Sequence, residues 1–143
     1  MSKIKNSVNK NSVSWVEMPG IEGFEVQLRF LTREDLMKIR NSSLSFKFSK
    51  KTHQREEEVD NDKFLENYAD KAIADWRGLK IKHLAELFPA DISGQDPDDI
   101  IEYNSEEALN LLKHSTIFDT FITEMMGDFE QFSIVKAEIQ AKN

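Results

Sequence analysis

The change in hydrophobic period along the chain is the feature that most constrains its fold. Over residues 24–30 apolar and polar residues alternate strictly, which places all four apolar side chains on one face of a strand. From Asp62 onward apolar residues recur at spacings of three and four, the period of an amphipathic helix. The sequence therefore predicts an α+β fold that is mostly helical and carries a small antiparallel sheet near the N-terminus.

That sheet is expected to have two or three strands. Residues 14–18 also alternate, and the Pro-Gly pair that follows favours a β-hairpin whose loop covers residues 19–23. Leu44, Phe46 and Phe48 alternate with polar residues and could add a third strand. Residues 1–12 are polar, so we expect a flexible tail, followed by one domain over residues 13–143.

Capping and breaking residues suggest where the first helices begin and end. Thr32 can cap a helix that fades near residues 41–43. The charged run that follows has nothing to bury and predicts a mobile loop near residues 49–60. Gly78 is placed to end a helix that starts at Asp62 and runs through Trp76.

Three further helices are expected in the second half of the chain. A short one lies within residues 79–88, and residues 91–102 then form a loop. Asn104 or Ser105 can cap the next helix, which breaks at His114. Thr116 opens the longest periodic segment, a C-terminal helix rich in Phe.

Charge is unevenly distributed over the 143 residues, whose net charge is −7. Residues 86–112 contain eight acidic side chains and no Lys or Arg, which is unfavourable for nucleic-acid binding and favourable for a basic partner. The alternative, that the acidic surface only keeps the protein soluble, stays open. There is no secretory signal and no apolar run long enough to span a bilayer, so we expect a cytoplasmic protein.

The residues that usually perform catalysis do not form a recognisable group. Cysteine is absent, and His53, His83 and His114 are far apart in sequence without a metal-ligand spacing. The acidic residues after position 96 do not fit the calcium-loop pattern, and the glycines at 20 and 23 lie in a turn between strands. We therefore expect neither an enzyme nor a bound cofactor or metal.

The apolar stripe of the C-terminal helix is the candidate for partner binding. Most of it is expected to be core, but paired methionines beside phenylalanines widen the stripe, and Met-rich faces accept partner helices. Part of it could thus be an exposed groove or a self-association surface. The residues concerned are Phe121, Met125, Met126, Phe129 and Phe132. Trp76, by contrast, is expected to be a core anchor rather than a binding residue.

Two short motifs and the Phe-rich helix after them resemble the tail assembly chaperones of long-tailed bacteriophages. The first motif is an acidic residue followed by Trp-x-Gly, and the second is an aromatic residue, a small polar residue and later a Glu-x₃-Leu-Leu segment. Their positions in this chain are Asp75, Trp76, Gly78, Tyr103, Asn104, Glu107, Leu111 and Leu112. The resemblance covers most of residues 13–132, although the charged insertion near residues 50–60 has no counterpart.

The resemblance implies a non-enzymatic function. Members of that family bind the tape-measure protein, keep it soluble in the host cytoplasm, help recruit tail-tube subunits, and are absent from the mature virion. Two alternatives remain at this stage: a structural tail completion protein that stays in the particle, and an acidic inhibitor that mimics DNA.

Overall fold

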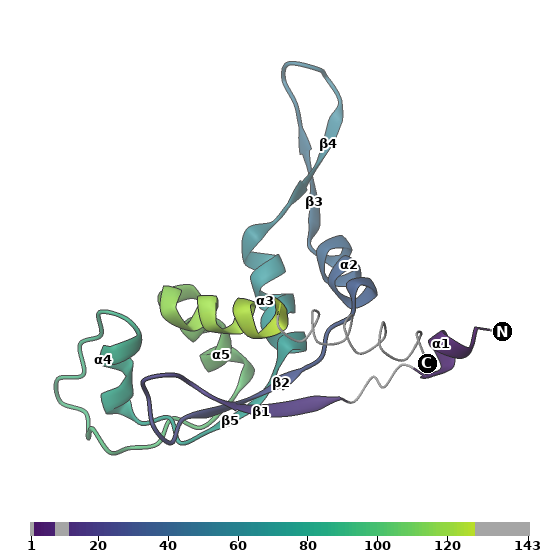
Figure 1. Cartoon of the computed structure of the whole chain (residues 1–143). Coiled ribbons are helices and arrows are strands. Elements are labelled where there is room, and N and C mark those ends of the chain that lie inside the picture. The colour runs from purple at the N-terminus through teal and green to yellow at the C-terminus, as the bar shows by residue number, and fades with distance from the viewer. Residues whose placement is uncertain (1, 8–11, 128–143) are drawn as a thin grey trace.

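The computed structural model describes residues 2–7 and 12–127, and its architecture is the expected α+β class (Figure 1). A three-stranded antiparallel sheet has the order β1 (Val13–Glu17), β2 (Glu25–Arg29), β5 (Ile73–Arg77). Helices α3 (Asn61–Ala72) and α5 (Ser105–His114) and the helical residues 116–127 pack near this sheet, and a second, two-stranded hairpin extends away from the helices (Figure 1).

Strands β1 (Val13–Glu17) and β2 (Glu25–Arg29) form the predicted hairpin. Its loop is closed by a hydrogen bond from the Met18 N–H to the Phe24 carbonyl, 2.9 Å long. The core-facing side of β2 is Val26 and Leu28, both fully buried. This hairpin could be predicted because its alternation and its turn signal are both local.

Strand β5 (Ile73–Arg77) corrects the expectation that one helix runs through Trp76. Helix α3 (Asn61–Ala72) stops earlier, and the chain then pairs with β2. Leu28 lies opposite Ile73 and Val26 lies opposite Trp76, with a bulge between the two pairs. Because of the bulge, Ile73 and Trp76 lie on the same face of the strand although they are three residues apart. This spacing is also typical of a helix, which explains why the sequence predicted one.

Gly78 follows strand β5, which corrects the expectation that this glycine ends a helix. Its φ is +78°, a conformation that glycine adopts without a steric penalty. A Cβ atom at this position would collide with the backbone carbonyl of Gly23 in the β1–β2 loop. Gly78 therefore permits the close contact between the end of β5 and that loop.

Strands β3 (Leu44–Phe48) and β4 (Arg55–Val59) correct two further expectations. Residues 44–48 pair with β4 and do not join the main sheet, and much of the charged run expected to be a loop is strand. The run of glutamates in β4 has low strand propensity, so the backbone pairing with β3 overrides the local preference. The Arg55 guanidinium also lies 4.7 Å from the centre of the Phe46 ring.

Most of the helix ends agree with the capping residues. Helix α2 (Arg33–Ser42) begins with the expected Thr32 cap, and α5 (Ser105–His114) begins at Asn104, whose side chain accepts from the Glu107 N–H at 2.8 Å. The segment after residue 79 forms the 3₁₀ helix η1 (Ile81–His83) and α4 (Leu84–Leu87). In the expected N-terminal tail, α1 (Lys3–Ser7) is helical.

The N-cap of the helix over residues 116–127 lies one residue earlier than expected. Ser115, not Thr116, accepts a hydrogen bond from the Phe118 N–H at 3.0 Å. The same hydroxyl donates to the Leu87 carbonyl at 2.7 Å, so this buried serine also connects α4 to the helix over residues 116–127. The sequence offers two adjacent hydroxyls, and only the tertiary contact selects Ser115.

The core lies between the sheet and the helices. Among its fully buried side chains are Phe24, Val26, Leu28, Ile73, Phe118 and Ile122. In the part of the chain described here, no helix combines the length and the apolarity needed to cross a bilayer.

The contact between Gly78 and Gly23 predicts an unequal response to alanine at two glycines with similar φ. Gly94 has φ of +80°, but no atom lies within 4 Å of the place that a Cβ would occupy, so Gly94→Ala should lower the free energy of unfolding by about 1 kcal/mol. Gly78→Ala adds a backbone collision and should cost about 3 kcal/mol or more. Urea unfolding of both variants measures the difference; equal losses would contradict the close contact.

Candidate functional site

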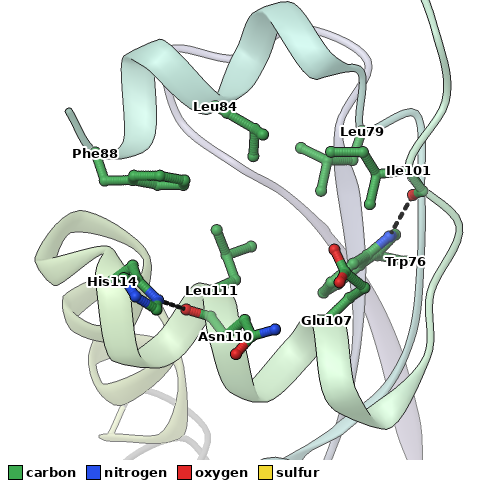
Figure 2. Close-up of a pocket in the computed structure, with 9 residues that line it drawn as sticks. All are labelled: Trp76, Leu79, Leu84, Phe88, Ile101, Glu107, Asn110, Leu111 and His114. Atoms are coloured by element: carbon green, nitrogen blue, oxygen red, sulfur yellow. Dashed lines mark hydrogen bonds between the residues drawn. The ribbon is translucent and has the colours of Figure 1, made fainter. Parts of the chain in front are cut away.

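A small pocket lies between η1 and α4 on one side and α5 on the other, with the Trp76 indole at one end (Figure 2). Its volume is about 90 Å³, much less than the several hundred Å³ of a typical cofactor site and suited to one apolar side chain. Its walls are mostly apolar, with polar groups on the α5 side. The lining residues are Trp76, Leu79, Leu84, Phe88, Ile101, Glu107, Asn110, Leu111 and His114. We call it the Trp76 pocket.

Trp76 is held in place by contacts to three parts of the chain. Its indole N–H donates to the Ile101 carbonyl at 2.9 Å (Figure 2). Its ring makes edge-on contacts with Tyr103, Phe24 and Phe118, at centroid distances of 5.3, 6.2 and 6.5 Å. With its polar atom satisfied and only 4% of its surface exposed, Trp76 is the core anchor that the sequence predicted.

The segment opposite Trp76 is fixed by backbone and side-chain hydrogen bonds. The Ile101 N–H donates to the Leu79 carbonyl at 2.8 Å, and the Tyr103 hydroxyl donates to the Ile73 carbonyl at 3.1 Å. These bonds attach the loop before α5 to Ile73, the first residue of β5, and to Leu79, which follows the strand. The Ile101 side of the pocket is therefore rigidly positioned although it belongs to a loop.

Helix α5 supplies the polar side of the pocket. Glu107, Asn110, Leu111 and His114 are spaced by three and four residues, so they share one helical face. Leu111 is buried, Glu107 is half-buried, and Asn110 and His114 are exposed. The His114 Nδ1 lies 2.8 Å from the Asn110 carbonyl, which can only accept, so Nδ1 donates in this contact.

The electrostatics of the pocket favour a cation beside its opening. Glu107 is the only carboxylate among the lining residues, and the lining contains no Lys or Arg. Among the described residues, none forms an ion pair with Glu107. Exposed acids at Glu102 and Glu106 lie close to it in sequence and add to the negative potential.

Residues from both motifs meet at this pocket. Trp76, Glu107 and Leu111 line it, the Tyr103 ring contacts the Trp76 indole, and Leu112 is buried in the core. The remaining three residues shape the backbone: the Asp75 side chain accepts from the Trp76 N–H at 2.8 Å, Gly78 forms the turn after β5, and Asn104 caps α5. Sequence reasoning found these residues but not the pocket.

The pocket also contains residues that sequence reasoning did not connect with function. Leu84 and Phe88 fall in the short helix expected within residues 79–88, for which the sequence predicts no role in binding. Nothing in their spacing indicates that they face α5, because that placement depends on the bond between Ser115 and Leu87.

The partner-binding stripe needs a correction where the structure describes it. Phe121 and Met126, at 5% and 8% exposure, belong to the core instead of a surface groove. The reason is that residues 116–127 turn their apolar face toward the sheet, where Phe118 stacks 6.3 Å from Phe24. Met125 is half-buried, and Phe129 and Phe132 lie outside the described residues.

No group of three or more metal-ligating side chains occurs within residues 2–7 and 12–127. The loop acid Asp91 has its pKa lowered by hydrogen bonds from the Ser93 hydroxyl and backbone N–H. It is an exposed residue of a turn and is not part of the pocket.

His83 precedes the pocket residue Leu84, and its hydrogen bond to the backbone depends on its protonation state. Its Nδ1 accepts a hydrogen bond from the Lys80 N–H at 3.0 Å, which requires the neutral ring. Burial chiefly lowers the pKa of His83 below its usual 6.5; the charges of Lys82 and Lys80 act in the same direction and Glu86 acts against them. Protonation would break this bond at the start of η1.

This arrangement predicts a loss of stability in weak acid. Because the unfolded chain binds the His83 proton first, the contribution of His83 to the free energy of unfolding is complete above the unfolded pKa and declines as the pH falls below 6.5 toward the lower pKa of the folded state. His83→Gln should reduce this decline, and the exposed His53→Gln should not. NMR titration should give His83 a pKa below 6.5, and a value above it would contradict the neutral acceptor.

The Trp76 pocket is thus built by β5, by α4 with the loop before it, and by α5 with the Ile101 loop, and it offers an apolar interior beside one carboxylate that has no ion-pair partner within residues 2–7 and 12–127. Such a site can hold an apolar side chain of a partner whose neighbouring residue is basic. Comparison of the chain with protein-family models, with curated proteins and with solved structures gives no match in any of the three.

Proposed function

We propose that this chain is a non-enzymatic tail assembly chaperone that binds a phage tape-measure protein through the Trp76 pocket. The observation that carries the proposal is the meeting of the two motifs: Trp76, Glu107 and Leu111, far apart in sequence, line one open pocket. A motif that only stabilised the core would not need to surround unfilled apolar space, because protein interiors are close-packed.

The chemistry of the pocket specifies the kind of client segment. A tape-measure protein is a long helical protein, and an amphipathic helix presents apolar side chains at intervals of three and four residues. One such side chain fills the space between Leu84, Phe88 and Leu111. A Lys or Arg one helical turn away then lies close to Glu107, which has no other ion-pair partner in the described chain.

The acidic run around the pocket acts on the rate of binding. Residues 86–112 carry acidic groups without any Lys or Arg, so a basic client is attracted before contact is made. In this role the protein acts in the host cytoplasm, holds the client soluble while tail-tube subunits are recruited, and is absent from the mature virion.

Co-expression with the tape-measure protein tests the proposal directly. The client should be soluble and co-purify with this chain, and purified virions analysed by mass spectrometry should lack the chain. A client that is equally insoluble with and without the chain overturns the proposal. Presence in virions at a fixed copy number would instead support a structural tail protein.

Reversing one charge at the pocket should weaken client binding. Glu107→Lys replaces an attractive contact with a repulsive one, and we expect the dissociation constant to rise roughly tenfold. Isothermal titration calorimetry against a soluble tape-measure fragment measures the change. The effect should be larger at low salt, where charges are less screened.

The matched control is Glu106→Lys, because Glu106 is the preceding residue of the same helix and does not line the pocket. Both substitutions change the net charge equally. If the two variants lost the same affinity, the acidic surface would attract the client without any role for the pocket.

A further inference from the structure

The β3–β4 hairpin has an exposed apolar face that the Trp76 pocket does not use. The hairpin forms a separate sheet that does not pair with the main sheet, and it extends away from the helices (Figure 1). Phe46 is 58% exposed and Phe48 is 60% exposed. An isolated two-stranded hairpin is marginally stable in water, and two exposed phenylalanines on it mark a contact surface.

The hydrogen-bond pattern shows which backbone groups of β3 have no partner strand among the described residues. At the two ends of the hairpin the bonded pairs are Ser49 with Gln54 and Ser43 with Asp60, at 2.9 Å each. Bonded and non-bonded pairs alternate in an antiparallel ladder, so the backbone N–H and C=O groups of Leu44, Phe46 and Phe48 point away from β4. The three residues with apolar side chains are therefore also the ones whose backbone N–H and C=O groups form the open edge of the hairpin.

The two edges of this hairpin differ in charge. Strand β4 contains Glu56, Glu57 and Glu58 in succession, so two β4 edges placed together would bring glutamates opposite one another. The outward-facing positions of β3 are all apolar. Charge thus protects the β4 edge from pairing and leaves the β3 edge available.

We propose that β3 is a self-association edge, at which two copies of this chain pair antiparallel with Phe46 on the two-fold axis. In this register Phe46 lies opposite its own copy and Leu44 lies opposite Phe48. Two neighbouring registers would also let the outward backbone groups of the two β3 strands bond. If the two-fold axis moves toward the hairpin loop, Lys50 lies opposite Leu44, and if it moves the other way, Ser42 lies opposite Phe48. Only the Phe46-centred register matches all three apolar residues with apolar partners.

The resulting assembly is a four-stranded sheet with the order β4-β3-β3-β4. Its two outer strands carry the glutamates, which prevent further copies from adding at the edges. The contact involves one short strand from each copy, so its area falls below the roughly 1,200 Å² of a stable interface. The dimer is therefore weak and depends on protein concentration.

Cysteine crosslinking tests both the edge and the register, because the chain has no native cysteine. In Phe46→Cys the two new thiols face each other across the axis, where opposite bonded residues have Cα atoms about 5.5 Å apart, within disulfide range. We expect most of this variant to form a covalent dimer on mild oxidation. The matched control is Glu57→Cys, which lies opposite Phe46 on the other edge of the same hairpin and should remain monomeric.

Two crosslinking results would overturn the proposal: no crosslinking of Phe46→Cys, or equal crosslinking of the two variants, which would indicate random collisions. A second measurement uses sedimentation equilibrium of the full chain. Phe46→Glu places two carboxylates on the axis and should raise the dimer dissociation constant at least tenfold, whereas Met37→Glu, another exposed apolar position at 50%, should leave it unchanged. A native chain that is monomeric at all concentrations would also overturn the proposal.

Discussion

The buried indole of Trp76 is the interaction on which the rest of this structure depends. Its ring contacts Phe24 from the hairpin loop, Tyr103 from the loop before α5, and Phe118 from the last helix described. Its N–H is satisfied by the Ile101 carbonyl, so the largest side chain in the core carries no unpaired donor. Segments from four regions of the sequence thus meet at one side chain, and the same indole forms one end of the open pocket.

The fold class, the first hairpin and most of the helix caps could be predicted because their signals are local. Thr32 and Asn104 lie within three residues of the amides that they cap. Strand β5 could not be predicted, because its bulge gives Ile73 and Trp76 a helical spacing. Strand β4 was missed for another reason: its glutamates disfavour a strand, and only pairing with β3 makes it one.

The site was predictable in its residues and not in its shape. The two motifs contain Trp76, Glu107 and Leu111, yet their convergence depends on the 2.9 Å bond to Ile101, which no spacing reveals. The stripe on the last helix illustrates the opposite error. Phe121 and Met126 look suited to a partner by residue type, but both are already buried in the core. The sequence identifies apolar residues that could contact a partner, but only the tertiary structure shows which of them remain exposed for such a contact.

The position of the β3–β4 hairpin in the chain has a consequence for how this protein can vary. The hairpin leaves and returns at Ser43 and Asp60, whose backbones are joined by a 2.9 Å hydrogen bond. Helices α2 and α3, on either side, pack against each other and hold this junction closed. Because loop-closure entropy grows only slowly with length, residues between these two points can be inserted or deleted at little thermodynamic cost. The hairpin is therefore a module whose length and surface can diverge among related sequences while the sheet and the Trp76 pocket stay the same.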